Sequence, residues 1–294
     1  MLIPKPPRVQ KTLFNLFHKG STTYFNSTLF FPDNVKKDVF KLYAFLRKAD
    51  NYVDLIPQDV EGFYAFKEEY ERAASGYQSS DIVINEFVEL SNRKKFEQEW
   101  ITAFLDAMES DLYRKTYYTL DELCVYMYGS AEVVGLFMAK ILDLPEESYI
   151  YARFLGRAMQ YINFIRDIRE DYELGRQYLP YEEMRMHGIE DFEPARFCGK
   201  HESFARFIRL QIERYLEWQR FAEQGYKYIP YRYLIPIKTA ADMYKWTAKI
   251  IHRHPSIVFM RKVKPRKRRV VYGANVNFVL ALRHKIFTGG LVWP

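Results

Sequence analysis

Three oxygen-bearing side chains are regularly spaced in the segment Gln160–Pro180, which reads QYINFIRDIREDYELGRQYLP. Asn163, Asp167 and Asp171 lie four residues apart, and they fall along one face of a helix because an α-helix turns once in roughly 3.6 residues. Carboxylate and amide groups are costly to bury without partners, whereas Mg²⁺ binds oxygen ligands of this kind. The spacing therefore predicts one wall of a divalent-cation site.

A second acidic segment, Leu42–Asp54, has a comparable arrangement. Tyr43, Arg47, Asp50 and Asp54 follow one another at steps of four, three and four residues, so they share a helical face. Each segment alone fits a solvated acidic surface, on which like charges at this spacing repel slightly. Two such segments, each set among apolar side chains and each with an arginine, favour a metal–diphosphate cage. In it Mg²⁺, or Mn²⁺, would lie between two carboxylate walls while arginines bind phosphate oxygens.

Four segments resemble the squalene/phytoene synthase family. YAFLRKADNYVD and NFIRDIREDYELGRQYLP resemble the two aspartate-rich signatures of that family. STTYFNSTLFFP (Ser21–Pro32) is similar to its N-terminal phosphate-contacting segment, and YMYGSAEVVGLF (Tyr126–Phe137) is similar to its central tyrosine/glycine motif. The resemblance covers roughly residues 14–265. It implies the isoprenoid-synthase fold, an all-α single domain in which a helical bundle surrounds a central cavity.

The resemblance also implies roles for individual residues. The metal ligands would be Asp50, Asp54, Asn163, Asp167 and Asp171. The catalytic residues would be Tyr43, Arg47, Asp50, Asp54, Tyr128, Asp167 and Asp171. The substrate-binding residues, which contact diphosphate, would be Ser21, Thr23, Arg47, Arg166, Arg176, Tyr244 and Lys262. The rings of Tyr43 and Tyr128 would stabilise a carbocation or guide the loss of its proton.

Two positions depart from the family pattern. Lys262 stands where the family often has an arginine, so a point charge replaces a planar fork that binds two oxygens at once. Glu132 stands where the family usually has glycine or another small neutral residue. A carboxylate there has to face solvent, pair with a basic side chain or take part in the site, and the sequence leaves these three alternatives open.

The resemblance implies a prenyltransferase that condenses two prenyl diphosphates head-to-head. Departure of one diphosphate would leave a carbocation, and attack by the second substrate's double bond would give a cyclopropyl diphosphate that then rearranges. Proton loss would give phytoene from two geranylgeranyl diphosphates, by way of prephytoene diphosphate. Two farnesyl diphosphates would instead give dehydrosqualene or, with hydride from NADPH, squalene.

The signatures look most like those of archaeal and bacterial phytoene synthases, so we expect phytoene as the product and no need for NADPH. The alternative product is squalene or dehydrosqualene. An alternative of another class is a non-catalytic lipid-binding protein with a decayed site. The complete set of acidic residues argues against that alternative.

Composition and hydrophobic periodicity predict a helical protein. The 294 residues are 48% hydrophobic, with 24 Tyr and 23 Phe but only 13 Gly and 13 Pro, which favours long helices with short connections. We expect a first helix and a turn at residues 11–31, and then a helix that Asp33 or Asn34 caps, that carries residues 43–54 and that ends before Pro57. Further helices are expected at residues 58–76, 81–112, 120–144, 155–172, 203–228 and 237–252. Residues 181–200 are expected to form a surface excursion. These elements belong to one domain, residues 1–265, whose first residues (1–12) are expected to form a flexible arm.

We expect a cytoplasmic protein. The N-terminal MLIPKPPRVQK lacks the apolar core of a signal peptide, and no apolar run of about 18 residues predicts a membrane-spanning helix. The two cysteines, Cys124 and Cys198, form no disulfide framework and no metal quartet, which fits a reducing compartment. Motifs for nucleotide binding or metalloprotease chemistry, such as Walker A or HExxH, are absent.

The C-terminal tail, residues 266–294, continues a strongly basic run. Seven of the nine residues from Arg261 to Arg269 are Lys or Arg, and the following VVYGANVNFVLALRHKIFTGGLVWP is apolar and aromatic. Such a run can simply be solvated, and no pattern of a nucleic-acid module accompanies it. Basic side chains near an apolar segment attract anionic lipid by about 1 kcal/mol each. We therefore expect peripheral contact with the inner face of the cell membrane, which the net charge of +7 also favours, and no nucleic-acid partner.

Overall fold

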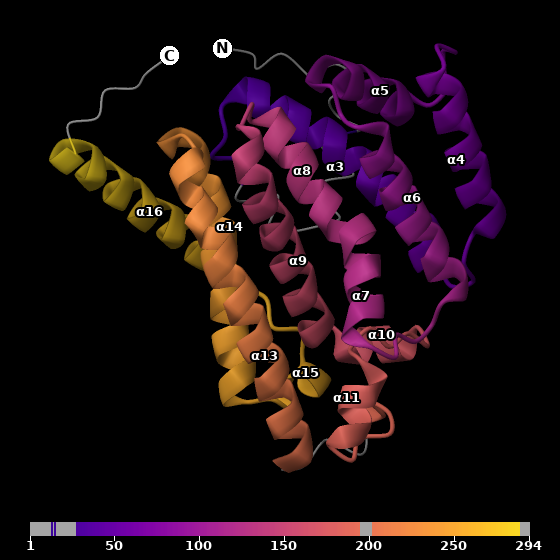
Figure 1. Ribbon diagram of the computed structural model, residues 1–294, viewed down its shortest axis with the longest axis vertical. Coiled ribbons are helices and arrows are strands. Elements are labelled where there is room, and N and C mark those ends of the chain that lie inside the picture. Colours follow the sequence, from indigo (N-terminus) through magenta and orange to yellow (C-terminus); the bar gives the residue numbers. More distant parts are fainter. Residues whose placement is uncertain (1–12, 14, 16–27, 195–201, 289–294) are drawn as a thin grey trace.

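The computed structural model describes residues 13, 15, 28–194 and 202–288 of the chain. Every regular element in those ranges is a helix, and the strand-like pairing found there is one isolated bridge between Thr116 and Gln177. Central helices are flanked on one side by the N-terminal helices and on the other by the C-terminal helices (Figure 1). The all-α prediction is confirmed.

The N-terminal half consists of α3 (Asp33–Asp54), α4 (Val60–Ala74), α5 (Ile82–Lys94) and α6 (Gln98–Tyr113). Helix α3 buries an apolar stripe at helical spacing, so its acidic residues lie on another face. The aspartates that precede α4 and α5 cap them, because their side chains accept hydrogen bonds from backbone N–H groups of the first turn. The single helix expected over 81–112 is two helices, because Lys95 adopts a left-handed conformation (φ 51°) that ends α5.

The helix expected over 120–144 lies at the centre of the bundle and contains an irregular turn. It runs as α7 (Leu120–Met127), a π-helical turn (Tyr128–Glu132) and α8 (Val133–Ile141). This 22-residue stretch has the length and composition of a membrane span, and it is the one such stretch in the described ranges. However, 56% of its apolar window is buried inside the protein, so we interpret it as the core helix of the bundle.

The second central helix is α9 (Tyr149–Arg166), which is followed by α10 (Ile168–Glu173). The sequence predicted one helix over 155–172. The structure begins it at Tyr149 and interrupts it at Asp167, where φ is −100° and ψ is 12°. Helical hydrogen bonding continues across the interruption, since the amide of Asp171 donates to the carbonyl oxygen of Asp167 at 2.9 Å.

The C-terminal half consists of α11 (Tyr181–Met186), α13 (Glu202–Glu223), a 3₁₀ turn (Gln224–Tyr228), α14 (Tyr231–Arg253), α15 (Ile257–Met260) and α16 (Lys267–Thr288). Two expectations are corrected here. Residues 181–194 are more than a surface excursion, because Met184, Ile189 and Phe192 are buried. Helix α14 begins before Ile237, because Pro236 lies near its start, where one lost backbone hydrogen bond is tolerated. Within the basic and apolar tail, Lys267–Thr288 form α16, which packs along α14.

Candidate active site

Two adjoining cavities lie between α3 and the central helices. The first, which we call the chamber, is polar and has a volume of about 540 Å³. The second, which we call the tunnel, is apolar and has a volume of about 270 Å³. The residues that line both are Tyr43, Leu46, Ser130, Val134, Gln160 and Asn163. The chamber therefore continues directly into the tunnel.

The chamber brings together most of the residues that the sequence singled out. Those from α3 are Tyr43, Arg47, Asp50 and Asp54. Those from α9, α10 and the loop that follows are Asn163, Arg166, Asp167, Asp171 and Arg176. Tyr244 of α14 and Lys262 complete the set. Ser21 and Thr23 lie outside the residues that the structure describes.

Helix α3 forms one wall of the chamber and carries a compact charge cluster. Arg47 forms an ion pair with Asp50, and its Nη1 lies 3.8 Å from Oδ2 of Asp54. Arg176 donates hydrogen bonds to Oδ1 of Asp54, at 2.8 Å, and to the carbonyl oxygen of Val53. Burial, together with the negative charge of Asp54, raises the pKa of Asp50 to about 7. The two arginines thus do not fully offset the cost of placing two carboxylates here.

Helices α9 and α10 form the opposite wall. Arg166 binds both carboxylate oxygens of Asp167, at 2.7 Å through Nε and 2.5 Å through Nη2, and Nζ of Lys262 lies 3.1 Å from Oδ1. Burial acts to raise the pKa of Asp167, but the hydrogen bonds and charges of these two partners outweigh it, so the pKa lies below its ordinary value. Burial and the charge of Asp167 hold the pKa of Asp171 well above its ordinary value. Additional positive charge would therefore stabilise ionised Asp171.

The chamber fits a divalent cation that binds together with a diphosphate. Oδ1 of Asn163 is buried and has no hydrogen-bond partner among the described residues. The raised pKa values of Asp50 and Asp171 indicate carboxylates that a cation would stabilise. In the described ranges, no three His, Cys, Asp or Glu side chains lie close enough to hold a metal ion by themselves. Mg²⁺ usually combines one or two carboxylates with phosphate oxygens of the substrate, and two facing acidic walls suit that combination.

A buried carboxylate beside the chamber was missed by the sequence analysis. Asp111 of α6 accepts hydrogen bonds from the hydroxyls of Tyr126, at 2.7 Å, and Tyr178, at 3.0 Å. Burial raises the pKa of Asp111 to about 6, against the opposing effects of Arg176 and the two hydroxyls. The rings of Tyr126 and Tyr178 stack with centroids 5.4 Å apart, and Phe164 stacks on Tyr178 at 4.3 Å. All three rings and Asp111 line the chamber, which therefore has an aromatic side.

The central motif faces the chamber with Tyr126 and not with Tyr128. Tyr126 and Ser130, four residues apart, both line the chamber, whereas Tyr128 lines neither cavity and has the guanidinium of Arg153 over its ring at 5.2 Å. The prediction for Tyr128 is corrected accordingly, since a residue two positions along a helix points to another side. The pattern that could have identified Tyr126 is the stripe of residues that α7 buries, to which Tyr126 belongs. Asp111 could have been noticed as a carboxylate among the apolar residues that α6 buries.

The unusual carboxylate of Glu132 pairs with basic side chains, which was the second of the three alternatives. Glu132 is fully buried. Its oxygens accept hydrogen bonds from Nε of Arg153 at 2.9 Å and from Nε of Arg157 at 2.6 Å. It lines neither cavity. Glu132 therefore ties the π-helical turn to α9 and does not contribute to the chamber.

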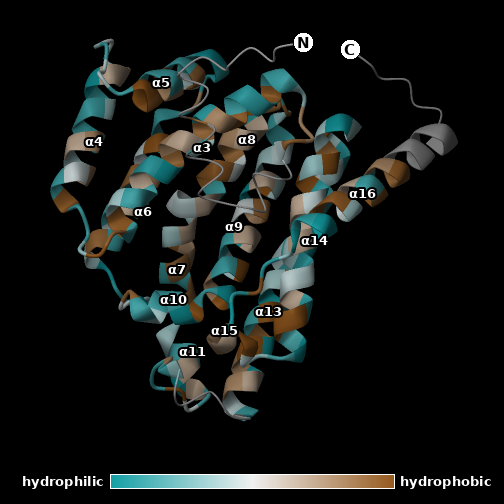
Figure 2. Cartoon of the chain, turned by 180° about the vertical axis from the view of Figure 1, so that it is seen from behind, coloured by the Kyte–Doolittle hydropathy of each residue, from teal (hydrophilic) through white to brown (hydrophobic). Residues whose placement is uncertain are grey.

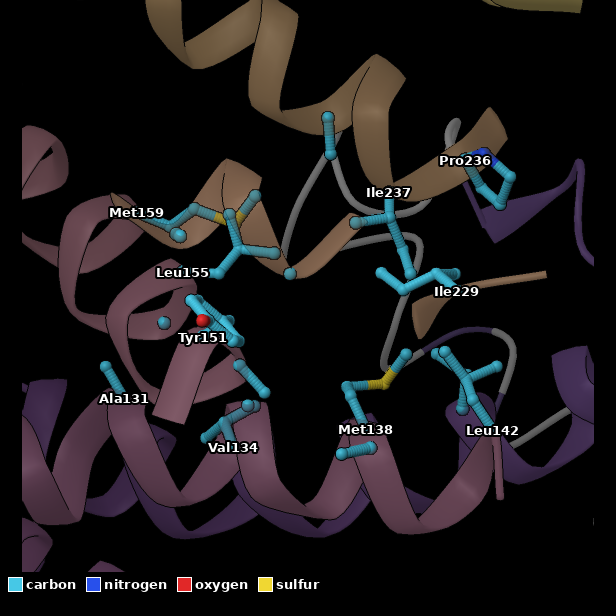
Figure 3. A pocket seen from close by; sticks show the side chains of 18 of the residues that line it. Ala131, Val134, Met138, Leu142, Tyr151, Leu155, Met159, Ile229, Pro236 and Ile237 are labelled. Carbon is cyan, nitrogen blue, oxygen red and sulfur yellow. The ribbon is translucent and has the colours of Figure 1, made fainter. Parts of the chain in front are cut away.

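The tunnel is suited to a hydrocarbon chain. Side chains from the π-helical turn, α8, α9 and the region around the start of α14 point into it (Figure 3). Those labelled in the figure are Ala131, Val134, Met138, Leu142, Tyr151, Leu155, Met159, Ile229, Pro236 and Ile237. Such a wall favours apolar ligands through burial of their surface and offers few hydrogen-bond partners.

Known proteins share both the sequence and the fold. The squalene/phytoene synthase family matches residues 17–269. Phytoene synthase 2 (chloroplastic) of Solanum lycopersicum is 28% identical over 220 residues, covering 70% of this chain and 69% of that protein. A 15-cis-phytoene synthase of Synechocystis sp. is 26% identical over 267 residues, covering 85% and 79%. The 4,4′-diapophytoene synthase of Staphylococcus haemolyticus is 28% identical over 153 residues, covering 50% and 53%.

Solved structures confirm the predicted isoprenoid-synthase type of helical fold. A dehydrosqualene synthase in complex with ligand superimposes with a TM-score of 0.85 at 21% identity, covering 94% of this chain and 98% of that one. The squalene synthase HpnC from Alicyclobacillus acidocaldarius superimposes with a TM-score of 0.74 at 21% identity, covering 85% and 96%. With the family match extending over most of its length, the chain belongs to the squalene/phytoene synthase family, whose members are divalent-metal-dependent prenyltransferases that condense prenyl diphosphates head-to-head.

Proposed function

We propose that this chain condenses two geranylgeranyl diphosphates to phytoene by way of prephytoene diphosphate, with Mg²⁺ as cofactor. The observation that carries the proposal is a chamber with two acidic walls and several cationic side chains, from which an apolar tunnel continues. The phytoene synthases named above match this chain over longer stretches than the 4,4′-diapophytoene synthase does. The preference for a C40 product rests on the two aspartate-rich signatures, which look most like those of archaeal and bacterial phytoene synthases.

Of the five cationic side chains that line the chamber, four are placed to bind and orient diphosphate, and Lys264 is the fifth. Arg47, Arg166, Arg176 and Lys262 all line the chamber, and each is paired with a carboxylate of one of its walls. A guanidinium group binds carboxylate and phosphate oxygens through the same parallel hydrogen bonds. These side chains can therefore exchange a carboxylate partner for phosphate oxygens when substrate enters.

The oxygen ligands for Mg²⁺ would come from both walls. They are Asp50, Asp54, Asn163, Asp167 and Asp171. When bound, Mg²⁺ neutralises the diphosphate and so makes it a better leaving group. The carboxylates hold the negative charge that a cation requires, and Asn163 supplies a neutral oxygen whose burial without a partner is otherwise costly.

The carbocation that remains after diphosphate departs needs protection from water. The rings of Tyr43, Tyr126, Phe164 and Tyr178 line the chamber, and Tyr43 also lines the tunnel. The face of an aromatic ring attracts a cation, while the apolar tunnel excludes water from the prenyl chain. We assign the protection of the cation to these rings. Asp111 keeps two of them in place through their hydroxyls.

A product assay tests the proposal. The purified protein is incubated with Mg²⁺ and either geranylgeranyl or farnesyl diphosphate, each with and without NADPH, and the extracted hydrocarbons are identified by mass. We expect a C40 hydrocarbon from geranylgeranyl diphosphate whether or not NADPH is present, because the last step is loss of a proton. A C30 product from farnesyl diphosphate, with no C40 product from geranylgeranyl diphosphate, would overturn the substrate assignment. Dependence of that product on NADPH would then separate squalene from dehydrosqualene.

A pair of matched variants tests whether the chamber performs the reaction. Asp167→Asn should lower turnover by about a hundredfold or more, since it weakens electrostatic stabilisation of the departing diphosphate. Asp106→Asn is the control, because the side chain of Asp106 is 59% exposed and lies outside the chamber. If neither the wild type nor Asp106→Asn releases diphosphate, the non-catalytic, lipid-binding alternative is favoured. Equal release by wild type and Asp167→Asn would contradict the assignment of this wall.

A further inference from the structure

Helix α16 turns its small and polar side chains toward the bundle. Ala274 and Asn277 are buried against α14. Nδ2 of Asn277 donates hydrogen bonds to Oγ1 of Thr239 at 3.2 Å and to Oδ2 of Asp242 at 3.0 Å. Gly273 lies so close to α14 that a Cβ there would be 3.1 Å from Cε of Met243. These contacts fix which face of α16 is buried.

The outward face of the same helix carries large apolar side chains. Those that are exposed, each between 39% and 70% accessible, are Val271, Tyr272, Val276, Phe278, Val279 and Leu280, and the exposed Asn275 is the polar residue among them. Hydrophobic residues are visible along α16 where it projects from the bundle (Figure 2). In an ordinary surface helix the large apolar residues face the core and polar residues face water, whereas within residues 267–280 Val270 is the one large apolar residue that is buried. Several exposed large apolar side chains on one helix mark an interaction site.

The charged residues of α16 and of the segment that leads into it are all of one sign. After Asp242 the chain contains twelve Lys and Arg residues and no Asp or Glu. At the start of α16, Arg266, Lys267 and Arg268 are exposed, and Arg269 lies over the ring of Trp246 at 4.8 Å. The apolar face is thus bordered by positive charge with no acidic residue of its own segment to balance it.

We propose that α16 docks on an anionic lipid bilayer, with its apolar face in the interface and its basic start against the headgroups. Apolar burial and attraction to anionic headgroups are the two contributions that hold a helix in a membrane interface, and α16 offers both. A second copy of the chain is a poorer occupant, because pairing two such faces would bring two basic segments together. This docking would hold for either prenyl chain length and does not depend on the product that we propose.

Docking through α16 would place the tunnel beside the bilayer. Helix α14 contacts α16 through Thr239 and Asp242, and it lines the tunnel with Pro236, Ile237 and Ala240. A single helix therefore separates the tunnel from the docking face. This position suits an apolar product that is far more soluble in lipid than in water.

Vesicle flotation with the full-length protein tests the docking. The vesicles are phosphatidylcholine alone or phosphatidylcholine mixed with phosphatidylserine. We expect the wild type to float only with the anionic vesicles and to be released by high salt, since screening weakens the attraction. The variant Arg266→Gln/Lys267→Gln/Arg268→Gln should bind about a hundredfold more weakly. The variant Phe278→Ser/Leu280→Ser should lose binding even at low salt.

Two controls separate docking from nonspecific adhesion and from self-association. Val125→Ser removes another exposed apolar side chain, 76% accessible on α7, and should float like the wild type. Sedimentation equilibrium of the wild type and of Phe278→Ser/Leu280→Ser reports the oligomeric state. Wild-type protein that stays with the dense fraction in the presence of anionic vesicles would overturn the proposal. Flotation that is unchanged in both α16 variants would also overturn it. So would a wild-type dimer that dissociates in Phe278→Ser/Leu280→Ser when neither protein binds vesicles.

Discussion

The carboxylates of the chamber differ in how far their charge is balanced. Asp167 has Arg166 and Lys262 as partners and a lowered pKa. Asp50 and Asp171 have raised pKa values, because burial and a neighbouring carboxylate outweigh the nearby cations. The carboxylates of the chamber are therefore not fully neutralised by the protein's own cations, and binding of a divalent cation would stabilise their ionised forms with release of protons.

Burial of Asp111 should make the free energy of unfolding depend on pH. Its pKa is about 6 in the folded protein and near 3.8 in an unfolded chain, so between these values the folded state binds more protons. The contribution of Asp111 to the free energy of unfolding is therefore greatest below the lower value. It falls by up to about 3 kcal/mol as pH rises through the upper value. Asp111→Asn should remove that fall, so urea unfolding should show the variant gaining stability relative to the wild type as pH rises from about 4 to about 7.

The matched control for this experiment is Asp106→Asn, which changes an exposed carboxylate on the same helix. It should show no comparable trend with pH. A difference between Asp111→Asn and the wild type that stayed constant across the same pH range would contradict a titrating carboxylate at this buried position.

Helical spacing predicted which polar residues share each wall of the chamber, whereas the family resemblance was needed for Arg176, Tyr244 and Lys262. Asp50 and Asp54, like Asn163 and Asp167, share a face whatever the rest of the fold does. The family resemblance pointed to Tyr128 in the central motif, whereas the residue that lines the chamber is Tyr126. Spacing also could not pair Asp111 with hydroxyls that lie 15 and 67 residues away, because such partners are brought together only by tertiary packing.

At the scale of elements, the chamber depends on close packing of the two central helices. Gly135 of α8 faces the backbone of α9 at Ala152, and both residues line the tunnel.

The sequence predicted the helical content, but several ends of helices depend on local backbone conformations. Lys95 is a favourable helix former and Asp167 lies inside a helical pattern, so only their φ and ψ angles show that regular helix is interrupted there. Elements are therefore more predictable than their boundaries.

A methyl group at the central crossing should force these helices apart. In Gly135→Ala the new Cβ would lie 2.1 Å from the carbonyl oxygen of Ala152, and relief of that clash should cost about 1–3 kcal/mol of stability. Gly273→Ala is the matched control, because its nearest contact is the flexible end of Met243 at 3.1 Å. The free energies of unfolding in urea compare the two. Equal effects, or a larger loss for Gly273→Ala, would contradict the close crossing.

At the scale of the whole molecule, the two acidic walls come from opposite halves of the chain. Helix α3 belongs to the N-terminal half, whereas α9 and α10 follow the central helix. Electrostatic repulsion between the walls disfavours their close approach, and Arg176 links them through its hydrogen bonds to Val53 and Asp54. A ligand that binds both walls should therefore stabilise the entire fold and not only its own site.

Thermal unfolding with inorganic diphosphate tests this coupling without any turnover. Mg²⁺ and diphosphate together should raise Tm by a few degrees, corresponding to about 2.7 kcal/mol when ligand is at a hundred times its Kd. Either component alone should give a smaller shift. Asp171→Asn should raise the Tm of the free protein, because it removes a carboxylate whose charge is disfavoured, and should lose most of the joint shift. The full shift in the presence of a chelator would contradict a metal site between the walls.

The π-helical turn in the central helix affects how the length of this chain can change. A π turn contains one residue more than the α-helix requires, so deletion of a single residue between Tyr128 and Glu132 would leave a regular helix. Everything that follows would keep its orientation, because the bond from the amide of Val133 to the carbonyl oxygen of Tyr128 would then span four residues, as in an α-helix. Val134 and Met138 would stay on the tunnel wall and Gly135 would stay against α9. The same deletion within α8 would instead rotate everything after it by about 100° around the helix axis, so this chain should tolerate the loss of one codon at the π turn but not a few residues further on.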